Sequence, residues 1–206
     1  MKNPMRAIFL DKDGTLVEDV PYNIDPARVK LSPGAGRALR IFQQHGYALF
    51  VASNQTGIAR GFFREQDLLP VQARLRQLLA REGVRLTGFH YCPHHPDSAI
   101  AQYAIHCACR KPMPGLLCHI AHVHGIELQA SWMIGDILDD VEAGRRAGCK
   151  TVLIDNGNET EWKRGAYRTP DLITPDLPGA ARGIESVDRV AAAKARLAPG
   201  KRMRHE

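Results

Sequence analysis

The sequence has no long hydrophobic run. Its longest apolar stretches, such as Tyr47 to Ala52, are far too short to cross a bilayer. The segment before Asp11 contains no hydrophobic core of the length that a signal peptide needs. From these two absences we expect a cytoplasmic protein that does not bind membranes.

Aromatic residues are also scarce, at 6% of the sequence, although the formal net charge is +6. A basic chain suits an anionic partner, but a surface that stacks single-stranded bases needs aromatic side chains beside its cations. The basic residues near the end of the sequence have no such neighbours, so nucleic acid is not expected as a partner. We expect a solvated tail there. Its basic residues are Lys194, Arg196, Lys201, Arg202 and Arg204.

No internal repeat and no low-complexity linker divides the sequence. Its 206 residues, 44% hydrophobic and 24% charged, are enough for one domain that builds its own core. We therefore expect residues 1–206 to form a single domain and a monomer. A disordered tail is expected at about residues 198–206.

Short apolar runs alternate with stretches of helical periodicity along most of the chain. This order predicts an α/β fold, a doubly wound parallel sheet with helices on both faces. Residues 156–178 are rich in turn formers and receive no assignment. The expected strands are Arg6–Leu10, Tyr47–Ala52, Gly88–Cys92, Trp132–Ile134 and Thr151–Ile154. The expected helices are Pro33–His45, Glu65–Arg81, Gly115–His124, Asp139–Ala147 and about Gly179–Leu197. In the second of these helices the expected inward residues are Leu68, Leu69, Leu75, Leu78 and Leu79.

Asp11 and Asp13 directly follow the first expected strand, in the motif Asp-Lys-Asp-Gly-Thr. Residues two apart in an extended chain point the same way, so both carboxylates can face one pocket. Open parallel sheets bind ligands beyond the carboxyl ends of their strands. Two carboxylates there can divide phosphoryl transfer, one attacking phosphorus while the other exchanges protons with the alkoxide and water. Because a phosphate dianion repels both, we expect a hard cation such as Mg²⁺.

Other polar residues follow the remaining expected strands. Asp136 is placed to complete a Mg²⁺ site and Asp140 to support it, although either could instead cap the following helix. Ser53 and Asn54 offer a hydroxyl and an amide to a phosphate, but such pairs are also common in turns. Lys111 offers a fixed cation for phosphate charge, and its alternative is a solvated surface lysine.

Three of the five cysteines lie in one stretch together with histidines. In a reducing compartment such a cluster favours a metal over disulfides. Three thiolates and an imidazole are the donors of a closed, tetrahedral, structural zinc site. We expect a Zn²⁺ to staple a loop at about residues 92–110, which has no clear helix or strand pattern. The expected ligands are Cys92, His94, Cys107 and Cys109. His95 and His106 remain open as replacements for the histidine.

The order and placement of these motifs resemble the haloacid dehalogenase superfamily of phosphatases over about residues 6–154. The resemblance rests above all on Asp-x-Asp-Gly-Thr at a strand end. It implies an aspartyl-phosphate formed on Asp11, with Asp13 as general acid and base. It also implies that Ser53 and Lys111 hold the phosphate. Mg²⁺ would lie between Asp11, the backbone carbonyl of Asp13 and Asp136.

The Cys/His loop resembles one branch of that superfamily, the D-glycero-D-manno-heptose 1,7-bisphosphate 7-phosphatases, which are related to histidinol-phosphate phosphatases. This implies release of the 7-phosphate in lipopolysaccharide heptose synthesis, with Arg110 on the second phosphate and no large cap domain. The matching stretches are residues 53–61, 91–96 and 109–112. One feature departs from this branch, since Ile137 stands where a basic residue is frequent. Residues 156–162 and the basic tail are not matched to it either. Alternatives are a histidinol-phosphate or other phosphometabolite phosphatase and, less favoured, a nucleic-acid end phosphatase.

Overall fold

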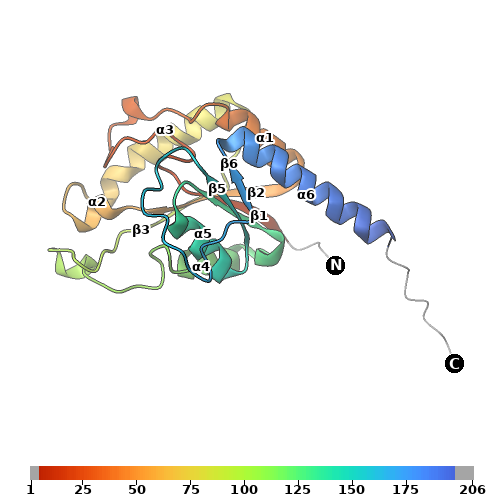
Figure 1. The fold of residues 1–206 in the computed structure, drawn as a ribbon. Coiled ribbons are helices and arrows are strands. Elements are labelled where there is room, and N and C mark those ends of the chain that lie inside the picture. Colours follow the sequence, from red (N-terminus) through yellow and green to blue (C-terminus); the bar gives the residue numbers. More distant parts are fainter. Residues whose placement is uncertain (1–4, 198–206) are drawn as a thin grey trace.

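The computed structural model describes residues 5–197, and an open parallel sheet between two layers of helices forms its centre (Figure 1). The expected disorder of residues 198–206 lies outside the described residues. The strands are β1 (Arg6–Leu10), β2 (Tyr47–Asn54), β3 (Gly88–Cys92), β4 (Trp132–Gly135), β5 (Lys150–Ile154) and β6 (Leu172–Thr174). Their order in the sheet is β3-β2-β1-β4-β5-β6, and every pairing is parallel.

In the part of the chain that the structure describes, six α-helices connect or follow these strands. They are α1 (Ala35–Gln44), α2 (Thr56–Ala59), α3 (Leu68–Arg81), α4 (Gly115–His124), α5 (Leu138–Ala147) and α6 (Leu177–Leu197). Single-turn 3₁₀ segments occur at Pro26–Arg28, Glu65–Asp67, Ala101–Tyr103 and Leu128–Ala130. Helices α1, α3 and α6 cover one face of the sheet, while α4 and α5 cover the other (Figure 1). The predicted doubly wound α/β fold is confirmed, and the described chain carries no large cap.

Strand β1 shows why the sheet is buried on both faces. Ile8 and Leu10 belong to the core under α1, α3 and α6, whereas Ala7 and Phe9 belong to the core under α4. All four side chains are fully buried. A central parallel strand therefore reads as a continuous apolar run rather than as an alternating one.

Helix α3 packs through side chains spaced three or four residues apart, the spacing that places residues on one helical face. Its buried residues are Leu68, Val71, Leu75 and Leu79. The expectation that Leu69 faces inward is wrong, since 62% of that residue is exposed. One residue advances a helix by about 100°, so Leu69 leaves the buried stripe that Leu68 begins.

Two elements are absent from the sequence-based assignment. Strand β6 pairs with β5 through Val152 and Leu172, and the short helix α2 follows β2 directly. Their short lengths give little periodicity to detect. Within the described part of the chain, no helix is both long and apolar enough to cross a membrane.

The chain order of the strands reverses between β1 and β4, because β2 and β3 lie on one side of β1 while β4 and β5 lie on the other. Leu10 at the end of β1 is paired with Val51 of β2 and with Ile134 of β4. Open α/β sheets bind ligands at such a reversal, beyond the strand ends. The fold thus brings Asp11, Ser53 and Asp136 to one edge.

Candidate active site

A buried lysine joins two carboxylates at this edge. Lys111 Nζ lies 2.5 Å from Asp11 Oδ1 and 2.5 Å from Asp140 Oδ1, and only 2% of its side chain is exposed. Burial by itself would lower the pKa of Lys111, but Asp11 and Asp140 raise it above its ordinary value. Lys111 is therefore a fixed cation beside Asp11, not a solvated surface lysine. Complete burial raises the pKa of Asp140, although the positive charge of Lys111 acts to lower it.

Asp13 follows Asp11 by two residues and is held by two donors. Lys12 Nζ donates to Asp13 Oδ1 at 2.7 Å, and Gln55 Nε2 donates to Asp13 Oδ2 at 3.3 Å. Desolvation raises the pKa of Asp13; Lys12 opposes this effect, and the negative charge of Asp11 adds to it. A carboxyl with a raised pKa is suited to carry a proton to a leaving group.

Asp136, which directly follows β4, is 95% buried and accepts one hydrogen bond on each oxygen. Thr15 Oγ1 donates to Oδ1 at 3.0 Å, and Asn158 Nδ2 donates to Oδ2 at 2.7 Å. Burial and the charge of Asp11 raise the pKa of Asp136 to about 6. Asp140 does contribute to the helix start, because its Oδ2 accepts from the backbone N–H of Ile137 at 3.4 Å.

Four carboxylates and two lysines thus meet at the strand ends, and we call this group the carboxylate edge: Asp11, Asp13, Asp136 and Asp140 with Lys12 and Lys111. Oxygen atoms of Asp11, Asp136 and Asp140 lie within 4.8 Å of one another. Oxygen donors are the ligands that Mg²⁺ prefers, and the carboxylates outnumber the lysines by two. The donor set therefore fits a divalent cation.

The residues that follow β2 support Lys111 and Asp13. The side-chain amide of Asn54 accepts from the backbone N–H of Lys111 and donates to its carbonyl, each at 3.0 Å. Ser53 is buried, and its Oγ accepts from Gln55 Nε2 at 2.9 Å, which leaves the hydroxyl hydrogen for another acceptor. Asn54 thus fixes the backbone that carries the lysine.

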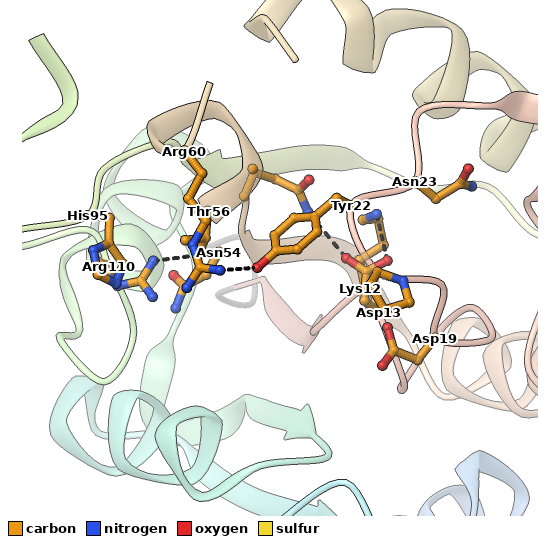
Figure 2. Close-up of a pocket in the computed structure, with 13 residues that line it drawn as sticks. Lys12, Asp13, Asp19, Tyr22, Asn23, Asn54, Thr56, Arg60, His95 and Arg110 are labelled. Atoms are coloured by element: carbon orange, nitrogen blue, oxygen red, sulfur yellow. Dashed lines mark hydrogen bonds and ion pairs between the residues drawn. The ribbon is translucent and has the colours of Figure 1, made fainter. Parts of the chain in front are cut away.

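A cavity of about 290 Å³ opens beside Asp13 (Figure 2). Arg60 and Arg110 contribute positive charge to its lining. Arg110 donates to the hydroxyl of Thr56 at 3.0 Å, and Arg60 donates to the hydroxyl of Tyr22 at 2.6 Å. The cavity places two guanidinium groups where the remainder of a bound molecule would lie.

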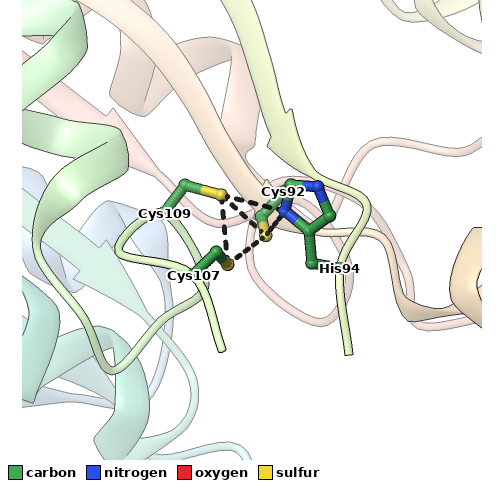
Figure 3. Close-up of side chains that lie close together, drawn as sticks. All are labelled: Cys92, His94, Cys107 and Cys109. Carbon is green, nitrogen blue, oxygen red and sulfur yellow. Dashed lines mark hydrogen bonds between the residues drawn. The ribbon is translucent and has the colours of Figure 1, made fainter. Parts of the chain in front are cut away.

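The Cys/His loop, residues 92–110, gathers four metal-ligand atoms (Figure 3). Cys92 Sγ lies 3.0 Å from Cys109 Sγ and 3.5 Å from Cys107 Sγ, and the last two are 3.3 Å apart. His94 Nδ1 lies 3.6 Å from Cys92 Sγ and 3.4 Å from Cys109 Sγ. Tetrahedral ligands about 2.3 Å from a zinc ion are about 3.7 Å apart, so the group is compact enough for Zn²⁺.

Of the three candidate histidines, the structure brings His94 to the thiols. His95 Nδ1 instead accepts from the backbone N–H of Asp97 at 3.2 Å, and His95 lines the cavity of Figure 2. His106 lines a separate pocket next to Cys107. A hydrogen bond with Cys92 is the main cause that lowers the pKa of Cys109 to about 5, which favours the thiolate that binds zinc.

Several residues at the site carry no role in the sequence analysis. Gln55 joins Ser53 to Asp13, Thr15 holds Asp136, and Asn158 reaches Asp136 from beyond β5. Thr15 belongs to the Asp-Lys-Asp-Gly-Thr motif and Gln55 directly follows Ser53 and Asn54. Their positions beside these candidate residues are the sequence signal that could have assigned them to the site. Asn158 lies in the unassigned turn-rich segment, and its proximity depends on the parallel pairing of β4 with β5.

Comparison with known proteins supports the same family. The model of a HAD-hydrolase-like family matches residues 108–180. The D-glycero-beta-D-manno-heptose-1,7-bisphosphate 7-phosphatase of Photorhabdus laumondii is 39% identical over 188 residues, which are 90% of this chain and 100% of that protein. The enzyme of that name from Escherichia coli K12 is 35% identical over 181 residues, covering 88% of each chain.

Two solved structures have folds similar to that of this chain. A HAD-like protein from Mesorhizobium loti has a TM-score of 0.78 and 32% identity, covering 90% of this chain and 88% of its own. The D,D-heptose 1,7-bisphosphate phosphatase of B. bronchiseptica, solved with magnesium and phosphate, has a TM-score of 0.70 and 28% identity, covering 89% of this chain and 99% of its own. With relatives at this identity over nearly their whole length, the chain belongs to the haloacid dehalogenase-like phosphatases, in the family of the D-glycero-beta-D-manno-heptose-1,7-bisphosphate 7-phosphatases.

Proposed function

We propose that the protein removes the 7-phosphate of D-glycero-D-manno-heptose 1,7-bisphosphate through an aspartyl-phosphate on Asp11. The main support for this choice of substrate is the 39% identity over the full length of the Photorhabdus relative. The contact of Lys111 with Asp11 supports the reaction, because the lysine lies where an incoming phosphate would need a cation. Release of this phosphate would serve the synthesis of lipopolysaccharide heptose.

In the first half-reaction a carboxylate oxygen of Asp11 forms a bond to phosphorus while the bond from phosphorus to the sugar oxygen breaks. Asp13 gives its proton to that sugar oxygen, so the product leaves as an alcohol. The raised pKa of Asp13 supports this role, since it favours the protonated carboxyl that donates the proton. Lys111 and the Ser53 hydroxyl hold the phosphoryl oxygens.

In the second half-reaction the Asp13 carboxylate takes a proton from water. The water oxygen bonds to phosphorus as the bond from phosphorus to Asp11 breaks. Inorganic phosphate leaves, Asp11 is again a carboxylate and Asp13 is again protonated. The protein therefore ends the cycle with the same charge and the same protons with which it began, so both aspartates are ready for the next turnover.

We propose that Asp11, the backbone carbonyl of Asp13 and Asp136 hold Mg²⁺, with Asp140 supporting them. When bound, the ion neutralises the charge that would otherwise keep a phosphate away from these carboxylates. The excess of carboxylates over lysines at the carboxylate edge supports this proposal. The magnesium and phosphate in the B. bronchiseptica structure also support it.

We propose that Zn²⁺ binds the Cys/His loop through Cys92, His94, Cys107 and Cys109 and is structural. Four protein ligands fill a tetrahedral shell and leave no position for substrate. Cys109 is followed directly by Arg110 and Lys111, so fixing the loop also fixes two residues of the site. A thiol-rich site of this kind suits a reducing compartment, which supports a cytoplasmic location. We also propose that the protein is a single-domain monomer.

Arg110 is proposed to hold the phosphate that is not transferred. It lies in the lining of the cavity that opens beside Asp13, and Arg60 adds a second positive charge to that wall (Figure 2). A guanidinium can bind a phosphate with two parallel hydrogen bonds. These two guanidinium groups would favour a bisphosphate over a monophosphate, because they can bind the second phosphate.

The test is phosphate release with Mg²⁺ from heptose 1,7-bisphosphate and from histidinol phosphate side by side, with Asp11→Asn as the blank. Preferential turnover of the bisphosphate with loss of the 7-phosphate, located by ³¹P NMR of the product, would support the proposal. Arg110→Ala should raise KM for the bisphosphate far more than for a monophosphate. Equal, weak turnover of both substrates would reject the heptose assignment while leaving the phosphatase reaction in place.

A further inference from the structure

The segment after β5 lies against the carboxylate edge, and we call residues 155–162 the strap. Asn158 Nδ2 donates to Asp136 Oδ2 at 2.7 Å, and Asn156 Nδ2 donates to the carbonyl of Gly14 at 2.8 Å. Glu159 Oε2 accepts from the backbone N–H of Leu138 at 2.7 Å, at the start of α5. The strap thus connects the turn after β1, the end of β4 and the start of α5.

The strap also fixes its own backbone. The Asn156 side-chain oxygen accepts from the backbone N–H of Asn158 at 3.2 Å. Glu159 Oε1 accepts from the backbone N–H groups of Glu161 and Trp162 at 2.8 and 3.2 Å. These bonds hold the Asn158 amide in one place although that residue is exposed. Its place is therefore set by local hydrogen bonds and not by core packing.

Gly14 makes the close approach of these groups feasible. A Cβ at this position would lie 2.2 Å from Asp136 Oδ2 and 2.4 Å from Asn158 Nδ2. Its φ of +77° also falls in the region that glycine adopts readily. Any side chain here would separate Asn158 from Asp136.

A neutral amide is an appropriate partner for a carboxylate that must also bind a cation. A lysine or arginine would compete with the cation for Asp136 through its own charge, whereas an amide orients the carboxylate without neutralising it. With Thr15 on Oδ1 and Asn158 on Oδ2, the carboxylate plane is fixed from both sides. Each oxygen keeps lone pairs for a metal.

We propose that Asn158 is a positioning residue that orients Asp136 for the divalent cation, with Asn156 and Glu159 holding Asn158. This inference rests on the Mg²⁺ site of the proposed function. Partners of metal ligands commonly change metal affinity by about 10- to 100-fold when they are removed. The strap is thereby part of the metal site even though none of its residues is proposed to touch the metal.

The test compares Asn158→Ala and Asn158→Leu with wild type and with Thr160→Ala, a truncation in the same strap. Leucine keeps the branched shape and the number of side-chain heavy atoms of asparagine while removing the hydrogen bond. The apparent Mg²⁺ dissociation constant is measured from the Mg²⁺ dependence of Tm, without substrate, and again from Mg²⁺ titration of phosphate release. Both Asn158 variants should weaken Mg²⁺ about tenfold, with Tm in EDTA and KM at saturating Mg²⁺ unchanged. Thr160→Ala should match wild type.

Unchanged Mg²⁺ constants in both Asn158 variants would overturn the inference. So would a fall of Tm in EDTA with no change in Mg²⁺ affinity, because that result marks a structural role. A wild type whose Tm does not respond to Mg²⁺ would also overturn it. Failure of the proposed substrate is separate, since heptose bisphosphate can go unhydrolysed while the Tm measurement still reports Mg²⁺ binding.

Discussion

The carboxylate edge and the Cys/His loop both gather metal-ligand atoms, but they do so by different means. At the carboxylate edge the ligands follow β1 and β4, whose pairing through Leu10 and Ile134 sets their positions. The Cys/His loop has only one short 3₁₀ turn, Ala101–Tyr103, between its two ligand pairs. The edge is therefore held by the sheet whether or not a cation is bound, whereas we expect the loop to depend on the proposed Zn²⁺ for its order.

The largest expected effect separates chemistry from folding at the carboxylate edge. Asp11→Asn should lower phosphate release by at least about 10³-fold, because the amide cannot form the acyl phosphate. The far-UV CD spectrum should stay that of wild type, since the sheet and not Asp11 sets the strand ends. Asp97→Asn, at a residue 91% exposed on its side chain, is the matched control and should be fully active. Residual turnover near the wild-type rate would exclude Asp11 as nucleophile.

The second-largest expected effect is in the Cys/His loop, where one substitution should lower both stability and activity. Cys109→Ala should lose Zn²⁺ and about 4 kcal/mol of stability, a fall in Tm of roughly 8–16 °C. Phosphate release should fall with it, because Cys109 lies two residues before Lys111. Zinc content by mass spectrometry, Tm and turnover check this. Cys118 is an exposed cysteine on α4 outside the cluster, so Cys118→Ala should leave all three quantities unchanged. Full activity in zinc-free protein would show that activity does not depend on the metal in the loop.

A third prediction concerns the cost of burying charge at the carboxylate edge. Folding raises the pKa of Asp136 to about 6, from 3.8, so the folded protein binds the extra proton between these values. Stability from this group is thus present at low pH and is lost as pH rises from about 4 to 6. At pH 7 in EDTA, Asp136→Asn should therefore be more stable than wild type by about 3 kcal/mol.

Urea unfolding of both proteins at pH 5 and pH 7 checks that prediction. The advantage of the variant should shrink at pH 5, because Asp136 of wild type is then largely protonated. An advantage that is equal at both pH values would assign the effect to packing instead of charge. Activity of the variant should be lost, since the proposed Mg²⁺ ligand is gone.

The smallest expected effect lies inside the Cys/His loop. His95→Ala should keep Zn²⁺ and Tm, because His95 does not lie with the thiols and binds the backbone of Asp97 instead. His94→Ala should weaken Zn²⁺ by more than the about 10- to 100-fold that loss of a ligand's hydrogen-bond partner costs, because His94 is itself a proposed ligand. Competition with a zinc chelator measures both variants. A reversal of the two results would place His95 in the zinc site.

The carboxylate motif and the strands were predictable because both are local. A continuous apolar run before Asp11 indicates a buried strand, and Asp-x-Asp places two carboxylates on one side of the chain. Most boundaries matched or moved by one or two residues, but α3 begins three residues later than expected, and Leu69 was assigned to the wrong face. Strand β6 and helix α2 were missed, since elements of three or four residues carry no measurable period.

The roles of side chains that meet across the sheet were less predictable. Asn54 was expected on a phosphate, but its amide binds the backbone of Lys111, 57 residues away. Lys111 itself could have been a solvated lysine until the structure placed it between Asp11 and Asp140. The strap was unassigned because its contacts with Gly14 and Asp136 span more than 20 residues.

The sequence by itself determined the class of fold, the pair Asp11 and Asp13, and the three cysteines of the Cys/His loop, because each depends on neighbours in the chain. Only the tertiary structure decided which histidine joins the thiols, which charges surround Lys111 and what holds Asp136. Those contacts depend on the parallel register of β1, β2, β4 and β5, which brings distant strand ends together. Single-residue patterns cannot encode that register, since it results from the packing of all the strands and helices at once.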